Sequence, residues 1–147
     1  MFLIHLVLPP QCGGSPLEGS RGAKLAVRDN AIRLRLRCLL QIEALVFDIQ
    51  QAEFGLALPV ENQPDLKDVA AFFSGPGSAF WVALIDYNIV RCIGLEAIAG
   101  HAAVMRKFMV APTHRGSGSH IAIDLLAAFE AHAHAQGFNT IALSTVA

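Results

Sequence analysis

Charged side chains are scarce in this chain of 147 residues, because only 16% of the residues are Asp, Glu, Lys or Arg, against roughly 25% in typical soluble domains. The formal net charge is -1, so the chain lacks the basic excess expected of a general nucleic-acid-binding protein. Basic residues gather only locally, from Arg28 to Arg37 and again at Arg106, Lys107 and Arg115. We therefore expect no nucleic-acid partner.

Cysteine is also sparse, and long apolar runs are missing. Cys12, Cys38 and Cys92 are far apart, with neither zinc-ligand spacing nor an even number for a disulfide framework. We expect them to be buried or neutral thiols in a reducing compartment. No apolar run approaches the roughly 18 residues that cross a membrane, and "MFLIHLVLPP" lacks the positive start of a signal peptide. The sequence thus predicts a cytoplasmic protein without a metal site or a membrane partner.

Apolar residues are abundant, at 54% of the chain, which is enough to build the core of one domain at this length. Gly, Ser and Pro are frequent in residues 11–22, and such a composition is typical of linkers. We predict that residues 1–22 form a poorly ordered N-terminal extension and that residues 23–147 form a single domain.

The spacing of apolar residues predicts helices first and a sheet afterwards. The expected elements are a short strand at Lys24–Asp29, a helix at Ile32–Phe54, a short helix capped by Asp65 and ending at Phe73, antiparallel strands at Ala79–Asp86, Ile89–Ala99 and His101–Val110, a helix at Ile121–Gln136 and a strand at Thr140–Val146.

The last strand, loop, helix and strand form a right-handed crossover unit, so the two strands should be parallel. The loop "HRGSGSH" precedes the helix N-terminus, where exposed N–H groups and the helix dipole favour an anion. It is not a nucleotide P-loop, because Ser119 and His120 follow Gly118 where Lys and Ser or Thr are required. Gly116 and Gly118 also lack the third glycine of the dinucleotide fingerprint.

The segment "VMRKFMVAPTHRGSGSHIAIDLLAAFEAHAHAQGFNTIALST" resembles the Gcn5-related N-acetyltransferase (GNAT) superfamily. That family has a strand of the form "lrk-m-V-p", then an R/Q-x-x-G-x-G/A loop, then a helix with a Leu-Leu pair. Upstream, "IQQAEFGLALPVENQPDL" and "FWVAL" are similar to the first helix and second strand of one GNAT group. The resemblance covers residues 26–146 and implies an α/β fold with a mixed sheet, in which an antiparallel meander precedes a βαβ crossover.

The resemblance implies acetyl-CoA as co-substrate. Its pantetheine arm would pair with the main chain of Met109 and Val110 like an added strand. The diphosphate would lie on the loop and the helix start, where Arg115 would pair with a phosphate. The residues implied in diphosphate binding are Arg115, Gly116, Ser117, Gly118, Ser119, His120, Ile121 and Ala122.

Two alignments of this loop are open. Counting from Arg115 puts His120 at the last small position of the family motif, whereas counting back from Leu125 and Leu126 puts Ala122 there. A small residue is needed where the diphosphate approaches the backbone. We favour the alignment on the helix, in which the loop is two residues longer than the common form.

The implied activity is transfer of an acetyl group to a primary amine of a small-molecule or peptide acceptor by direct attack. Glu96 and His101, on or beside the meander strands, are the candidate general bases. The sequence does not select among acceptors. The alternative is a truncated, non-catalytic CoA-binding or protein-interaction module.

GNAT chains normally continue past the strand that here reads "LSTVA", with a helix and strands that often carry a tyrosine acid. The single tyrosine, Tyr87, falls in a predicted hairpin turn. We therefore expect the C-terminal helix and strands to be missing. The last strand would then be an open sheet edge, which is a candidate surface for a homodimer.

Overall fold

A computed structural model describes the backbone of residues 2–6, 21–116 and 121–143. Its elements are β1 (Phe2–Leu6), α1 (Arg21–Phe54), the 3-10 turn η1 (Val60–Asn62), α2 (Pro64–Lys67), α3 (Val69–Phe72), β2 (Ala79–Ile85), β3 (Asn88–Ala97), β4 (Ala102–Val110), the 3-10 turn η2 (Pro112–His114), α4 (Ile121–Ala135) and β5 (Thr140–Leu143). None of the helices in these ranges is long and apolar enough to span a bilayer.

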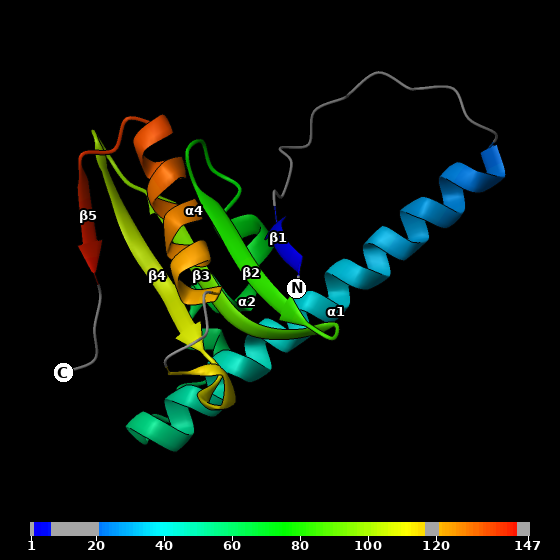
Figure 1. Ribbon diagram of the computed structural model, residues 1–147, viewed down its shortest axis with the longest axis horizontal. Helices are drawn as coiled ribbons and strands as arrows, with labels where there is room; N and C mark the ends of the chain where they lie inside the picture. Colours follow the sequence, from blue (N-terminus) through cyan, green and yellow to red (C-terminus); the bar gives the residue numbers. More distant parts are fainter. Residues whose placement is uncertain (1, 7–20, 117–120, 144–147) are drawn as a thin grey trace.

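The strands form one five-stranded sheet in the order β1-β2-β3-β4-β5. Neighbours from β1 to β4 are antiparallel, and β4 and β5 are parallel, with Ala102 opposite Thr140. α4 covers one face of the sheet, and α1 and α2 lie on the other (Figure 1). The predicted α/β class, the meander and the crossover are confirmed.

Each face of the sheet has its own apolar core. Successive residues of β2 alternate between the faces, as the pleat of a strand requires: Phe80 packs with the α1 side, and Trp81 packs with the α4 side. On the α1 side, Ile42 and Val46 of the helix are fully buried. On the α4 side, the ring of Phe129 meets that of Trp81 edge to face, with centroids 6.0 Å apart.

The N-terminal part of the chain differs from the prediction. The expected strand at Lys24–Asp29 is wrong, because α1 already begins at Arg21 and runs through it. A few alternating residues do not distinguish a strand from a helix that extends a longer periodic segment. Phe2–Leu6, within the segment expected to be poorly ordered, pairs with β2 as β1. The first half of α1 reaches beyond the sheet (Figure 1).

The pairing of β3 with β4 contains one irregularity, at Lys107. Cys92 pairs with Met109, but Gly94 pairs with Arg106, so two residues of β4 oppose Ile93 alone. This is a β-bulge, and such bulges re-aim side chains near sites. Lys107, at the bulge, has a φ of 51°, a left-handed conformation uncommon for a residue other than glycine.

Candidate active site

A cavity of about 380 Å³ lies against β3 and β4 on the face covered by α1 and α2. The size is at the lower end of the range of small-molecule sites. Its lining residues come from the end of α1, the segment between α1 and α2, α2 itself, and the two strands; they are Gln50, Leu56, Leu58, Asn62, Gln63, Pro64, Asp65, Phe72, Glu96, Met105, Arg106, Lys107 and Met109. The cavity therefore has both polar and apolar walls.

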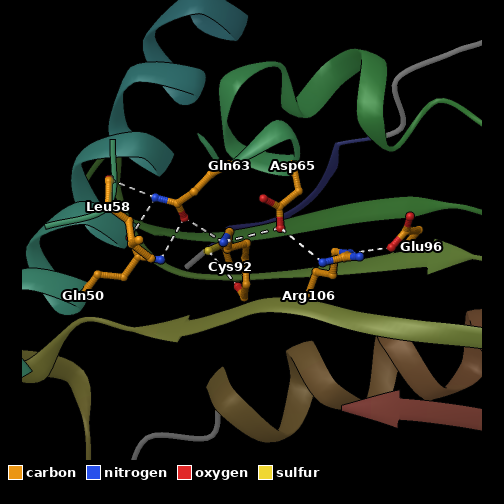
Figure 2. Close-up of polar contacts among 8 residues, drawn as sticks. Gln50, Leu58, Gln63, Asp65, Cys92, Glu96 and Arg106 are labelled. Carbon is orange, nitrogen blue, oxygen red and sulfur yellow. Dashed lines mark hydrogen bonds and ion pairs between the residues drawn. The ribbon is translucent and has the colours of Figure 1, made fainter. Parts of the chain in front are cut away.

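A pair of buried amides, Gln50 and Gln63, contributes to the cavity lining, and Figure 2 shows the two side chains facing each other. Gln50 donates from Nε2 to Oε1 of Gln63 at 2.8 Å, and Gln63 donates back to Oε1 of Gln50 at 3.1 Å. Gln63 also donates to the carbonyl oxygen of Leu58 at 3.2 Å. These bonds satisfy the buried amides and fasten the connection between α1 and α2 to the end of α1.

Charged side chains lie next to the Gln50–Gln63 pair, along β3 and β4. Lys107 Nζ lies 2.9 Å from Gln63 Oε1 and 3.4 Å from Asp65 Oδ2. Arg106 donates from Nε to Glu96 and places Nη1 4.0 Å from the same Asp65 oxygen. The Arg106 guanidinium also lies over the ring of Phe72, 5.4 Å from its centroid. Two cations and two carboxylates thus alternate beside the cavity (Figure 2).

The structure overturns the predicted role of Asp65. Asp65 lies within α2, where its carboxylate is buried and forms an ion pair with Lys107 of β4. Asp68 is the residue that caps a helix, because its side chain accepts the Ala71 N–H at 3.0 Å at the start of α3. Both are aspartates near a helix start, which is where caps are common. Sequence position alone therefore did not separate the cap from the buried ion-pair partner.

The two candidate bases lie in different places. Glu96 lines the cavity, with its side chain 24% exposed. His101 lies exposed in the turn between β3 and β4, where its carbonyl oxygen accepts the N–H of Asn139 at 2.9 Å. The structure therefore brings Glu96, and not His101, to the cavity wall.

The end of β4 presents backbone groups on the edge away from β3. The Ala111 N–H donates to the carbonyl oxygen of Val90 at 2.8 Å, and backbone groups alternate in direction along a strand. The N–H and C=O of Val110 therefore face the edge on which β5 lies. Within the described residues, β5 pairs with β4 only as far as Met105. Of the two predicted pantetheine contacts, Val110 faces this open edge, while Met109 lines the cavity.

Arg115 bridges the end of β4 and the end of α1. Its Nε and Nη2 donate to the Val110 carbonyl oxygen at 3.0 and 2.8 Å, and Nη2 lies 2.6 Å from Oε1 of Glu53. Gly116 follows with a φ of 112°, a conformation that favours glycine. Ser117, Gly118, Ser119 and His120 lie outside the described residues, and Ile121 and Ala122 begin α4.

Two thiols are buried in the core on the α1 side of the sheet. Burial raises the pKa of Cys92 to about 12, and its Sγ donates to the Lys107 carbonyl oxygen at 3.2 Å. Burial also raises the pKa of Cys38, and neither forms a disulfide. The prediction of buried thiols outside any disulfide is confirmed for these two cysteines. No group of three or more metal-ligating side chains occurs in the part of the chain that is described.

We expect these thiols to react only when the protein unfolds. In a Cys12→Ser background, a thiol reagent at pH 8 should label native protein at least 100-fold more slowly than protein in denaturant, because the thiolate is the reacting species. The unfolded chain should ionise Cys92 near pH 9, so the stability contributed by its neutral form should fall as pH rises from 9 towards 12. Fast labelling of native protein would contradict the buried positions.

Comparison with known proteins assigns the chain to a family. A model described as the acetyltransferase (GNAT) family matches residues 44–147. The chain is 35% identical over 104 residues to the probable N-acetyltransferase 14 of Xenopus tropicalis, covering 69% of this chain and 50% of that protein. It therefore spans half the length of this relative.

Two bacterial crystal structures are similar to the chain. The acetyltransferase of Streptococcus agalactiae 2603 aligns with a TM-score of 0.68 and 29% identity, over 73% of this chain and 65% of that one. The GNAT-family acetyltransferase of Staphylococcus aureus MU50 aligns with a TM-score of 0.67 and 26% identity, over 74% of this chain and 67% of that one. Because the family model covers most of the chain, the protein belongs to the GNAT acetyltransferase family.

Proposed function

We propose that this protein is an N-acetyltransferase that transfers the acetyl group of acetyl-CoA to a primary amine. The observation that carries the proposal is the arrangement around β4. Val110 presents backbone groups on the open edge of the strand, and the cavity with the Glu96 carboxylate lies on its α1 face. Acetyl-CoA at the edge of β4 and the amine on its α1 face would then both contact this strand, which would bring their reacting atoms close together.

Acetyl-CoA would bind along the open edge and at the helix start. The pantetheine arm would pair with the backbone of Val110 as an additional strand does. The diphosphate would lie on the segment from Arg115 to Ala122, where the N-terminus of the 15-residue helix α4 supplies N–H groups and a favourable dipole. Arg115 has a side chain that is 42% exposed, so it can exchange its present partners for a phosphate.

The reaction needs proximity and a neutral amine. The amine nitrogen attacks the thioester carbonyl carbon, an N–C bond forms, and the C–S bond then breaks to release CoA as a thiolate. Backbone N–H groups of β4 would stabilise the carbonyl oxygen as it becomes negative. Glu96, directly or through water, would accept the proton that the ammonium loses before attack. The second proton, which the nitrogen loses as the amide forms, would pass to solvent, and solvent would protonate the thiolate.

We expect the purified chain to release free thiol from acetyl-CoA when an amine is present. Calorimetry with acetyl-CoA should give about tenfold weaker binding for Arg115→Ala, because a charge-assisted contact to phosphate is lost. Glu53→Gln should bind acetyl-CoA as well as or better than the wild type, since it frees Arg115. The exposed Glu53 ion pair contributes little to stability, so both variants should fold.

Three outcomes separate the alternatives. Thiol release with an amine supports the acetyltransferase. Binding of acetyl-CoA without thiol release, for any amine tried, would favour the non-catalytic CoA-binding module. Absence of binding would overturn both, together with the placement of the diphosphate near Arg115.

A further inference from the structure

The charges beside the cavity form an inner and an outer pair. The inner pair, Lys107 and Asp65, has side chains only 14% and 6% exposed, and Lys107 also contacts Gln63. The outer pair, Arg106 and Glu96, has side chains 34% and 24% exposed. The charges of Lys107 and Asp65 therefore neutralise each other in the interior, and a ligand that enters the cavity would contact Arg106 and Glu96.

From this pairing we propose that the acetyl acceptor is a free α-amino acid with an apolar side chain. Its carboxylate would bind Arg106, and its amino group would lie at Glu96. The inference rests on the proposed function and adds the substrate class. A cavity with excess negative charge would bind any amine. Arg106 and Glu96 are adjacent and of opposite charge, so they complement an α-amino acid, in which the ammonium and the carboxylate are attached to the same carbon atom.

Arg106 is suited to hold a carboxylate. Its described contacts use Nε, towards Glu96, and Nη1, towards Asp65, which leaves the Nη2 side of the guanidinium for a ligand. Its position over the Phe72 ring limits its rotation, and a planar guanidinium binds carboxylates in a defined geometry. A lysine side chain of a protein has no carboxylate beside its amine and would leave this group unused.

The rest of the cavity fits an apolar side chain. Leu56, Leu58 and Met109 contribute apolar side chains to its lining, whereas the side chain of Met105 packs on the α4 face of the sheet, and Leu58 is 39% exposed at the surface. Methionine adapts to side chains of different shape, so the pocket should accept several apolar amino acids. We therefore choose L-leucine as the probe and L-leucinamide, which keeps the amine and the side chain but lacks the carboxylate, as its matched control.

The test compares both ligands in two assays of the full chain, calorimetric binding and thiol release from acetyl-CoA. The wild type should bind and use L-leucine at least tenfold better than L-leucinamide. Arg106→Gln should lose most of this preference by weakening L-leucine at least tenfold while changing L-leucinamide less than threefold. Arg106→Lys should retain part of the preference, and Lys67→Gln, which removes an exposed charge on α2 outside the cavity lining, should behave as the wild type.

The two readouts separate this inference from the proposed function. Binding of L-leucine that depends on Arg106, without binding of acetyl-CoA, would support the amino-acid site and overturn the acetyltransferase. Thiol release with amines at equal efficiency for both ligands would support the acetyltransferase and overturn the amino-acid site. An equal loss for both ligands in Arg106→Gln, or no L-leucine binding in the wild type, would also overturn it.

Discussion

Replacing Gly94 by alanine should destabilise the protein by about 3 kcal/mol, the upper part of the usual range for overpacking a core. A Cβ atom at this position would lie 2.5 Å from Cζ of Phe73 and 2.9 Å from Cδ2 of Phe80. Both rings are buried and pack against each other, with centroids 5.0 Å apart. They have little room to move, so the strain must be taken up by the sheet or by the helices above it.

Thermal and urea denaturation of Gly94→Ala measure the effect directly. For a domain of this size, 3 kcal/mol corresponds to a fall in Tm of roughly 6–12 °C. Gly75→Ala is the matched control, because a Cβ there would meet only Ser78 Oγ, at 3.8 Å, and should change stability by less than about 0.5 kcal/mol. Equal Tm values for the two variants would show that the aromatic rings do yield.

A second variant locates the strain. If the Phe73 ring is the obstacle, Gly94→Ala should cost much less in a Phe73→Leu background than in the wild type. A coupling free energy near zero in this double-mutant cycle would contradict the contact between the two residues.

The sequence predicted the sheet well because its information is local. In β2 to β4, short apolar stretches are separated by turn residues, and in α4 the apolar positions recur with a helical period. The parallel arrangement of β4 and β5 then follows from the handedness and geometry of a crossover. The N-terminal region was harder, since Lys24–Asp29 alternates over a few residues inside a helix that continues to Phe54.

The site was predicted only in part, because its geometry depends on distant residues. Glu96 was identified from its place on a meander strand, and it does line the cavity. The basic residues Arg106 and Lys107 form a visible cluster in the sequence, but their carboxylate partners, Glu96 and Asp65, lie elsewhere along the chain. Nothing in the local pattern around Lys107 indicates the bulge that turns it towards Asp65, since a bulge is defined by the pairing of two strands.

Replacing Lys107 by methionine should be the most destabilising of the charge changes in the cavity. Asp65 is 5% exposed, and Lys107 Nζ, at 3.4 Å, is its nearer cation, while Arg106 Nη1 lies at 4.0 Å. Removing one partner of a buried ion pair typically costs about 3–5 kcal/mol, because the other charge stays buried without compensation. We expect about 3 kcal/mol here, since Arg106 remains near the carboxylate.

The double variant Asp65→Asn/Lys107→Met distinguishes an uncompensated charge from lost packing. Removing both charges leaves no buried ion, and replacing a whole buried pair is often close to neutral. The double variant should therefore regain most of the stability that Lys107→Met loses, as measured by urea denaturation. Arg106→Gln should cost less than Lys107→Met, because its side chain is 34% exposed and exposed ion pairs contribute little. If the double variant is as unstable as the sum of its single changes, Lys107 stabilises the fold through the packing of its aliphatic chain at the bulge, and the ion pair adds little.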